Sequence, residues 1–239
     1  PHSEAGSLID GVGDRVSIAA INGPSNITLS GETAALQDIA ARCEKERIFA
    51  RFLKVTVPFH SAIMDTIADD FARSLEGIEP HPAHTAVVST VTGAPIDWRE
   101  ITVSYWLQNL RQPVLFAPAF EELLRMSHDI FIEISAHPVL STPMRDCMSG
   151  MGAKAFVLSS LRRGEPDDLV FRGSLGQLYT TGFAVDWERL YGNRGRFVRL
   201  PAYRWIGDRY WIESEESTDA RKNGRSPGGS GLMGRKIHP

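Results

Sequence analysis

Residues 130–134 read Ile-Phe-Ile-Glu-Ile, a short apolar run that predicts a β-strand. Residues 139–148 then predict a helix, and residues 156–158 a second strand. Strand and helix segments also alternate on the N-terminal side, with a strand at 87–91 and helices at 63–75, 103–110 and 119–126. This alternation predicts an α/β fold in which helices cover the faces of a sheet.

The segment before Pro58 has a different pattern. Its predicted elements are strands at 16–21 and 27–29, a helix from Ser30 to about Arg47, and a strand at Phe52–Val55. Two strands, a helix and a further strand are typical of a small ferredoxin-like lobe.

These patterns divide the chain into five parts. They are a loop at 1–15, a ferredoxin-like small subdomain at 16–56, a larger α/β part at 57–160, a closing helix (168–180) and linker within 161–213, and a flexible linker at 214–239.

The composition excludes several classes of protein. The 239 residues include 26 basic and 29 acidic side chains, so no basic surface for nucleic acid is expected. No apolar run approaches the length of a membrane span, and we expect a cytoplasmic protein with no membrane partner. Cys43 and Cys147 are too few for a disulfide framework or a zinc site, and we expect both to be inert thiols. Because Pro1 is not an initiator methionine, we expect a piece of a larger protein.

Residues 196–211 are rich in aromatic and basic side chains. One interpretation is an arm that packs on a neighbouring surface, and the other is a stacking platform for nucleic acid. The overall acidity favours the first.

Among the seven histidines, His60 has the most suggestive position. It follows the predicted strand at 52–55 and directly precedes Ser61, a candidate helix cap. The positive end of a helix favours a neutral imidazole, which a general base requires. The alternative is a structural role in the cap or the core. His81 and His84 are separated by Pro82 and complete no metal site, and His137 could be structural or functional.

The segment Val57–Met64, Val-Pro-Phe-His-Ser-Ala-Ile-Met, resembles the histidine motif of malonyl-CoA:ACP transacylases and polyketide synthase acyltransferases. Five further stretches resemble the same family in the same order, between residues 16 and 211. They are Ile-Asn-Gly-Pro-Ser-Asn at 21–26, Tyr-Trp-Leu-Gln-Asn-Leu-Arg-Gln-Pro-Val-Leu-Phe at 105–116, Phe-Ile-Glu-Ile-Ser-Ala-His-Pro-Val-Leu at 131–140, Leu-Ser-Ser-Leu-Arg-Arg at 158–163, and Leu-Pro-Ala-Tyr-Arg-Trp at 200–205.

The resemblance implies the C-terminal portion of an α/β-hydrolase-like large subdomain with an inserted ferredoxin-like small one. It also implies transfer of an acyl group from CoA to the phosphopantetheine thiol of an acyl carrier protein through an acyl-serine. His60 would be the base, and the main-chain carbonyl of Asn109 would orient its ring. No covalently bound cofactor is implied, and acyl-CoA is the substrate.

The sequence contains no Gly-His-Ser-x-Gly nucleophile elbow. We therefore expect the serine to come from a missing N-terminal half of the domain, and we expect the isolated chain to be inactive. One rival is a catalytically silent scaffold or docking module. A thioesterase fits the position of His60 less well, because such hydrolases place the histidine near the end of the domain.

Two residues before His60 bear on the substrate. In the family a Phe at the position of Phe59 accompanies malonyl, because its ring fills the space of an α-methyl group, whereas Pro58 departs from the usual small residue. The other implied partners are an adjacent ketosynthase and, from the resemblance of residues 236–239 to the opening of such a domain, a dehydratase.

Overall fold

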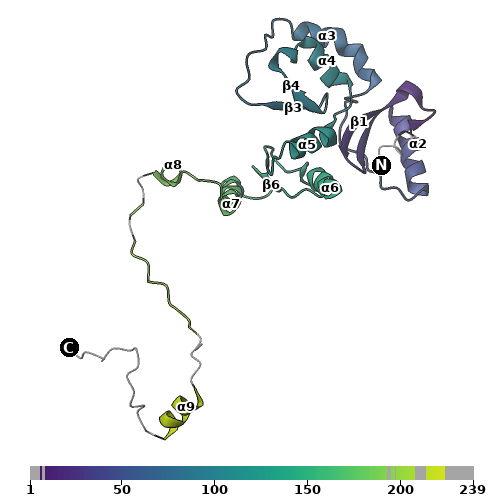
Figure 1. Ribbon diagram of the computed structural model, residues 1–239. Helices are drawn as coiled ribbons and strands as arrows, with labels where there is room; N and C mark the ends of the chain where they lie inside the picture. Colours follow the sequence, from purple (N-terminus) through teal and green to yellow (C-terminus); the bar gives the residue numbers. More distant parts are fainter. Residues whose placement is uncertain (1–5, 7–8, 193–194, 197, 208–213, 224–239) are drawn as a thin grey trace. The chain divides into compact units, whose positions relative to one another are not determined.

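The computed structural model describes residues 6, 9–192, 195–196, 198–207 and 214–223 (Figure 1). The chain divides into two units, Pro1–Val185 and Asp186–Pro239, which are described separately. The elements of the first unit are η1 (Gly13–Arg15), β1 (Val16–Gly23), β2 (Asn26–Gly31), α2 (Thr33–Lys45), η2 (Ala62–Ile67), α3 (Ala68–Ser74), β3 (Val87–Ser89), β4 (Ala94–Ile96), η3 (Trp98–Glu100), α4 (Val103–Arg111), α5 (Phe116–Arg125), β5 (Ile130–Glu133), α6 (Ser141–Met151), β6 (Phe156–Ser159) and α7 (Asp167–Thr180).

The N-terminal lobe is an antiparallel hairpin of β1 and β2 with α2 packed beside it. The apolar positions Ala35, Ile39 and Cys43 recur every four residues along α2 and form a buried cluster with Val16 of β1. The hairpin and the helix therefore lie where the sequence predicted them.

The expected strand at Phe52–Val55 is not formed. The described residues of the 16–56 region thus contain two strands and one helix, which is only part of a ferredoxin-like arrangement. A strand requires a neighbour that accepts and donates main-chain hydrogen bonds, and residues 51–56 form none that the structure records with another strand. The apolar side chains of this segment are correspondingly exposed, with Phe52 at 55% and Val55 at 62%.

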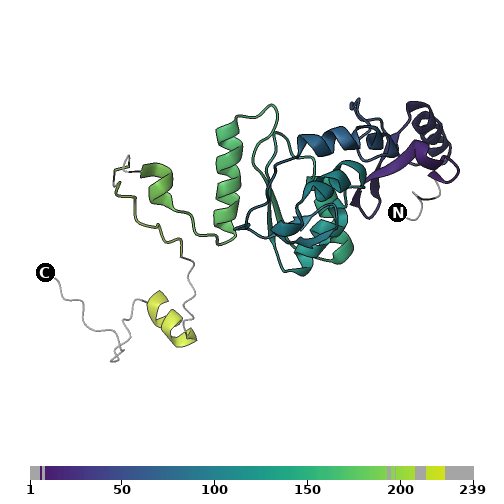
Figure 2. The ribbon, with the colours of Figure 1, turned by 90° about the horizontal axis from the view of Figure 1, so that it is seen from above.

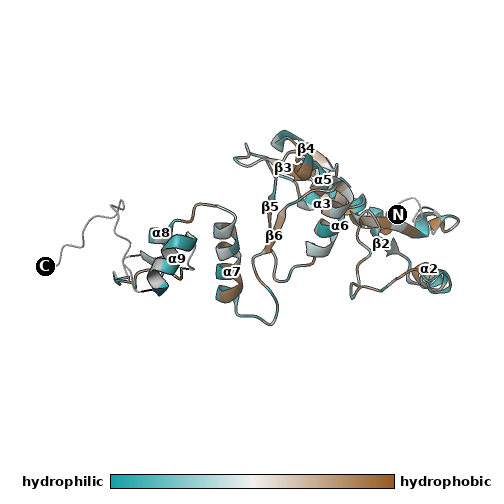
Figure 3. Ribbon diagram, turned by 60° about the horizontal axis from the view of Figure 1, so that its bottom comes forward, coloured by the Kyte–Doolittle hydropathy of each residue, from teal (hydrophilic) through white to brown (hydrophobic). Residues whose placement is uncertain are grey.

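The larger lobe is organised around β5, α6 and β6. The two strands pair in parallel, from Ile130 opposite Phe156 to Glu133 opposite Ser159. A buried cluster of Ala117, Phe120, Phe131, Met144 and Cys147 joins α5, β5 and α6, and the apolar character of β6 is visible in Figure 3. The strand–helix–strand unit predicted from the sequence is therefore confirmed.

A sheet covered by helices was expected for the larger part, but its described strands form two separate pairs, β3–β4 and β5–β6. The predicted strand at 87–91 ends at Ser89 and turns back into β4. Gly93 permits this turn with a φ of +71°, and a Cβ there would lie 2.9 Å from that of Pro118. The strand β4 was not predicted, because it is short and contains Pro95.

The segment after α4 connects the two lobes of the first unit. Val114 forms a parallel bridge with β1, through N–H···O bonds of 2.9 Å from Ile21 and 2.8 Å to Ala19. The next residue, Leu115, donates to the carbonyl of Thr90 at 2.6 Å. Residues 112–115 are therefore held from both sides.

The second unit contains α8 (Trp187–Tyr191) and α9 (Glu215–Lys222), and Figure 2 shows both from a second direction. The side chains of Tyr203 and Trp205 are 77% and 87% exposed, and Phe197, Tyr210 and Trp211 of the aromatic arm lie outside the described residues. The helix α9 lies within the segment 214–239, for which the sequence predicts a linker. No helix of the described residues is long and apolar enough to cross a bilayer.

Gly31 closes the β1–β2 pair at a position that tolerates no side chain. A Cβ there would lie 2.1 Å from the carbonyl oxygen of Arg15 and 2.7 Å from the Cα of Val16. Because both contacts are with main chain, we expect Gly31→Ala to lower the free energy of unfolding by about 2–3 kcal/mol, measured by urea denaturation. Gly173→Ala is the control, because its Cβ would meet open space. A loss at Gly31 no larger than at Gly173 would contradict the close approach.

Cys147 is fully buried, and this burial, with smaller contributions from the carboxylates of Glu121 and Asp146, raises the pKa of its thiol to about 11 from an ordinary 9.0. Between these values the unfolded chain loses this proton while the folded chain keeps it. Stability should therefore fall as the pH rises from 9 to 11, by up to about 2 kcal/mol from this group. Urea denaturation across this range should show a shallower fall for Cys147→Ala than for the unchanged protein. An identical pH dependence in the two proteins would refute this assignment.

Candidate active site around His60

His60 lies at a sharp bend between the extended segment before it and η2. Its backbone has a φ of +58°, in the left-handed region that few residues other than glycine adopt. The main-chain N–H of His60 donates to the carbonyl of Leu110 in α4 at 3.1 Å, and that of Phe59 donates to Val57 at 2.9 Å. An uncommon conformation held by a long-range bond, here the one to Leu110, is typical of functional positions.

Ser61 does not cap the following helix as predicted. Its hydroxyl donates backwards to the carbonyl of Pro58 at 2.6 Å, and the residue is 1% exposed. The helix begins as the 3₁₀ helix η2 and becomes α-helical only in α3, without a side-chain cap at Ser61. The role of Ser61 is therefore to fix the bend that precedes the helix.

The imidazole of His60 is oriented by a main-chain carbonyl, which belongs to Gln112 and not to Asn109. The Nδ1 atom lies 2.9 Å from the carbonyl oxygen of Gln112. Asn109 is inside α4, where carbonyls point along the helix axis. Gln112 is the first residue beyond α4, with a ψ of 159° that turns its carbonyl out of the helix. The orienting carbonyl expected at Asn109 is therefore found three residues later in the sequence, at Gln112.

This contact determines what the ring can do. A carbonyl only accepts, so Nδ1 carries the proton and the Nε2 lone pair remains available. The structure records no hydrogen bond to Nε2 from the described residues. An imidazole held in this tautomer can take a proton from a nucleophile that approaches Nε2.

The bend and the helix end are joined by a further contact. Arg111 Nε lies 3.0 Å from Asp65 Oδ1, which connects the last residue of α4 to η2. The Asp65 side chain is 63% exposed, so this ion pair contributes less than about 1 kcal/mol. Together with the bonds to Leu110 and Gln112 it holds His60 against the end of α4.

The two residues proposed to influence the choice of substrate, Pro58 and Phe59, differ in how exposed they are. Phe59 is 46% exposed, and its ring centroid lies 6.5 Å from that of His60 at an interplanar angle of 51°. Pro58 is half-buried and contributes its carbonyl to Ser61. The Phe59 ring is therefore more exposed beside His60 than Pro58 is.

Other candidates from the sequence do not join this site. His137 Nδ1 accepts from the main-chain N–H of Arg163 at 3.3 Å, in a different part of the lobe. The described residues contain no group of three side chains suited to a metal ion. Gln112 was not predicted from the sequence. Pro113 was the available signal, because the residue before a proline avoids the helical conformation and a helix therefore tends to end there.

The comparisons with known proteins place these features in a family. The model of the acyl transferase domain matches residues 6–185. The chain is 39% identical over 213 residues to the spectinabilin polyketide synthase system protein NorA′ of Streptomyces orinoci. It is 35% identical over 240 residues to the mycoketide-CoA synthase of Mycobacterium tuberculosis. These matches cover 88% and 99% of this chain, but only 6% of each relative.

Solved structures give the same relation. The acyltransferase domain of module 8 of the salinomycin polyketide synthase superposes with a TM-score of 0.75 at 34% identity, over 78% of this chain and 44% of that one. The acyltransferase domain of the second module of that synthase gives 0.76 at 30% identity, over 83% and 47%. The chain therefore spans less than half of each of these mixed α/β domains.

Proposed function

The chain belongs to the acyl transferase domain family of type I polyketide synthases, and from this premise we propose that it supplies the general base of an acyltransferase. The proposed reaction moves an acyl unit from CoA to the phosphopantetheine thiol of an acyl carrier protein. The observation that carries this proposal is the 2.9 Å contact of His60 Nδ1 with the Gln112 carbonyl, which leaves Nε2 free.

In the first half of the reaction, His60 Nε2 takes the proton of a serine hydroxyl as its oxygen attacks the thioester carbonyl. The carbon–sulfur bond breaks, and the CoA sulfur receives the proton from His60. In the second half, His60 takes the proton of the carrier thiol, whose sulfur attacks the acyl-serine. The serine oxygen leaves and recovers the proton, so His60 ends each cycle neutral.

We infer that the nucleophile comes from another part of the polypeptide, because this sequence has no Gly-His-Ser-x-Gly elbow. We therefore propose that this chain has no transferase activity by itself and acts with an N-terminal half that carries the serine. An α/β-hydrolase-like sheet completed by that half, with a complete ferredoxin-like small subdomain, remains part of the proposal.

The acyl unit proposed for this site is malonyl. Phe59 is beside His60, and its half-exposed ring would occupy the space that an α-methyl group needs. A single methyl group changes selectivity by only about 1–3 kcal/mol, so Phe59 would bias the choice without imposing it. The carrier protein, an adjacent ketosynthase and a following dehydratase are the proposed partners, in the cytoplasm.

One observation favours a second role, as a docking module without chemistry. The described part of the arm exposes Tyr203 and Trp205, whose rings meet edge to face at a centroid distance of 5.1 Å. Exposed aromatic pairs are common at protein interfaces. The two roles are compatible, since an arm can dock while His60 serves the reaction.

The proposal is tested by reassembly. The 239-residue chain is mixed with the N-terminal half of the acyltransferase domain from the parent gene, and transfer of radiolabelled malonyl to a carrier protein is measured. We expect transfer only when both halves are present. Transfer by the 239-residue chain alone, or none with both halves co-purified as a complex, would refute the proposal.

A further inference from the structure

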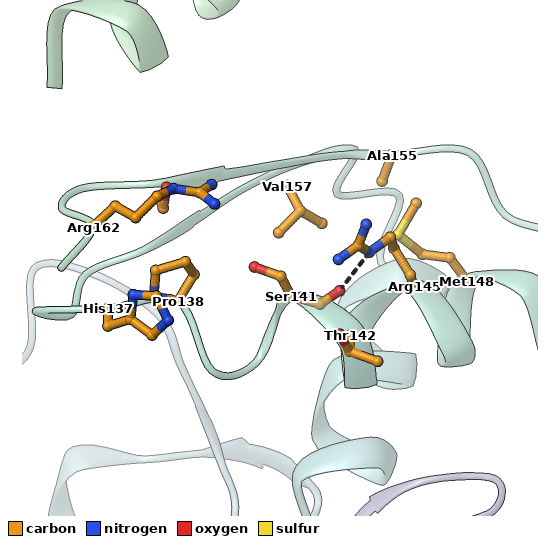
Figure 4. Close-up of a pocket in the computed structure, with 10 residues that line it drawn as sticks. His137, Pro138, Ser141, Thr142, Arg145, Met148, Ala155, Val157 and Arg162 are labelled. Atoms are coloured by element: carbon orange, nitrogen blue, oxygen red, sulfur yellow. Dashed lines mark hydrogen bonds between the residues drawn. The ribbon is translucent and has the colours of Figure 1, made fainter. Parts of the chain in front are cut away.

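A cavity of about 460 Å³ lies between the start of α6 and β6, apart from the contacts that hold His60 (Figure 4). Its polar lining consists of His137, Ser141, Thr142, Arg145, Ser159 and Arg162. No aspartate or glutamate lines it, although acidic residues outnumber basic ones in the chain. A cavity lined by two arginines and no acid is suited to an anion.

The geometry of the two arginines leaves donors free for a ligand. Arg145 Nε donates to the carbonyl of Ser141 at 3.0 Å, which fixes the guanidinium over the first turns of α6. Arg162 Nε lies 3.4 Å from Glu165 at the exposed rim. The structure records no partner among the described residues for the terminal nitrogens of either side chain. Each guanidinium can therefore present a pair of parallel N–H groups to an oxyanion.

His137 adds a donor of defined direction. Its Nδ1 accepts from the main-chain N–H of Arg163 at 3.3 Å, so Nε2 carries the proton. Figure 4 shows His137 and Ser141 on one side of the cavity and Arg162 across from them. The ligand would therefore meet donors from two directions.

The loop that leads into α6 is bound by a buried carboxylate. The buried carboxylate of Glu133 accepts from the main-chain N–H groups of Val139 at 2.7 Å and Leu140 at 3.2 Å. The remaining wall of the cavity is apolar, with Pro138, Met148, Ala155 and Val157. A suitable ligand thus combines a charged oxyanion with an aliphatic portion.

We propose that this cavity binds the phosphate of phosphopantetheine, the group common to CoA and to loaded carrier proteins, with the adjoining aliphatic chain against Met148 and Val157. This inference rests on the proposed function for its choice of phosphate ester. Phosphate matches the paired N–H groups of Arg145 and Arg162 better than a carboxylate of single charge.

The test is binding of 4′-phosphopantetheine to the 239-residue chain by calorimetry, with pantetheine, which lacks the phosphate, as the matched ligand. We expect pantetheine to bind at least about tenfold more weakly than phosphopantetheine. Arg145→Gln and Arg162→Gln should each lower the affinity for phosphopantetheine by about tenfold. Arg125→Gln, on α5 outside the cavity, is the control and should bind unchanged. Thermal unfolding of each variant verifies that it is folded.

CoA and a loaded carrier protein are then added as competitors, and whichever displaces phosphopantetheine identifies the natural source of the phosphate. Equal binding of pantetheine and phosphopantetheine, no binding of either, or full binding by both arginine variants would overturn the proposal. The measurement involves no acyl transfer. If phosphopantetheine did not bind, the proposed role of His60 would be unaffected. If acyl transfer were not observed, a measured phosphate site would still stand.

Discussion

His60→Ala is expected to lower the rate of malonyl transfer by the reassembled acyltransferase by about 10²–10⁴-fold, the usual contribution of a general base. The reason is that the serine and the carrier thiol each lose the acceptor of their proton. Single-turnover loading of the serine, followed by radiolabel, measures the first half of the reaction separately. We expect loading itself to fall, since the base acts in both halves.

The matched control is His128→Ala, an exposed histidine just beyond α5 that makes no side-chain contact with the His60 bend. It should retain full activity. Unfolding curves should show that the His60→Ala and His128→Ala proteins are equally folded. If His60→Ala kept more than about a tenth of the wild-type rate, His60 would not be the base.

Glu133→Ala is expected to have the largest effect on stability, about 2–4 kcal/mol in the free energy of unfolding. The Glu133 carboxylate is 5% exposed and accepts from the main-chain N–H groups of Val139 and Leu140. Alanine would leave these donors buried without an acceptor at the start of α6, with a cavity beside them. Urea denaturation measures the loss.

Glu133→Gln separates the two causes, because it preserves the volume and one carbonyl oxygen. We expect it to lose less than half of what alanine loses. If both substitutions cost less than about 0.5 kcal/mol, the carboxylate would not hold the 135–140 loop as the structure indicates. The same variants should weaken phosphopantetheine binding if the cavity forms as proposed, since Ser141 lies at its edge.

The elements predicted with least error are those whose signals are local. The apolar runs of β5 and β6 and the four-residue spacing of Ala35, Ile39 and Cys43 in α2 depend on short stretches of sequence. The bounds of each of these elements lie within three residues of the prediction. The elements that were predicted wrongly depend on neighbouring strands. Residues 52–55 have a strand-like composition, but strand formation requires a neighbour that local composition does not reveal.

The site shows the same division. The sequence singled out His60 from its place before a predicted helix, and the orienting carbonyl was expected at Asn109. The actual acceptor depends on where α4 ends, and helix ends are the least certain feature of a prediction. Glu133 and the cavity beside α6 gave no signal, because a buried carboxylate in an apolar run is recognisable only once its N–H partners are placed.

The most direct test of the account is the protonation of the His60 ring, observed by ¹⁵N NMR at neutral pH in the 239-residue chain and assigned by comparison with His60→Gln. We predict that the ring carries its proton on Nδ1, coupled across a hydrogen bond to the Gln112 carbonyl, and that Nε2 is unprotonated. A ring protonated at Nε2 alone, with Nδ1 unbound, would contradict the assignment of His60 as the oriented base.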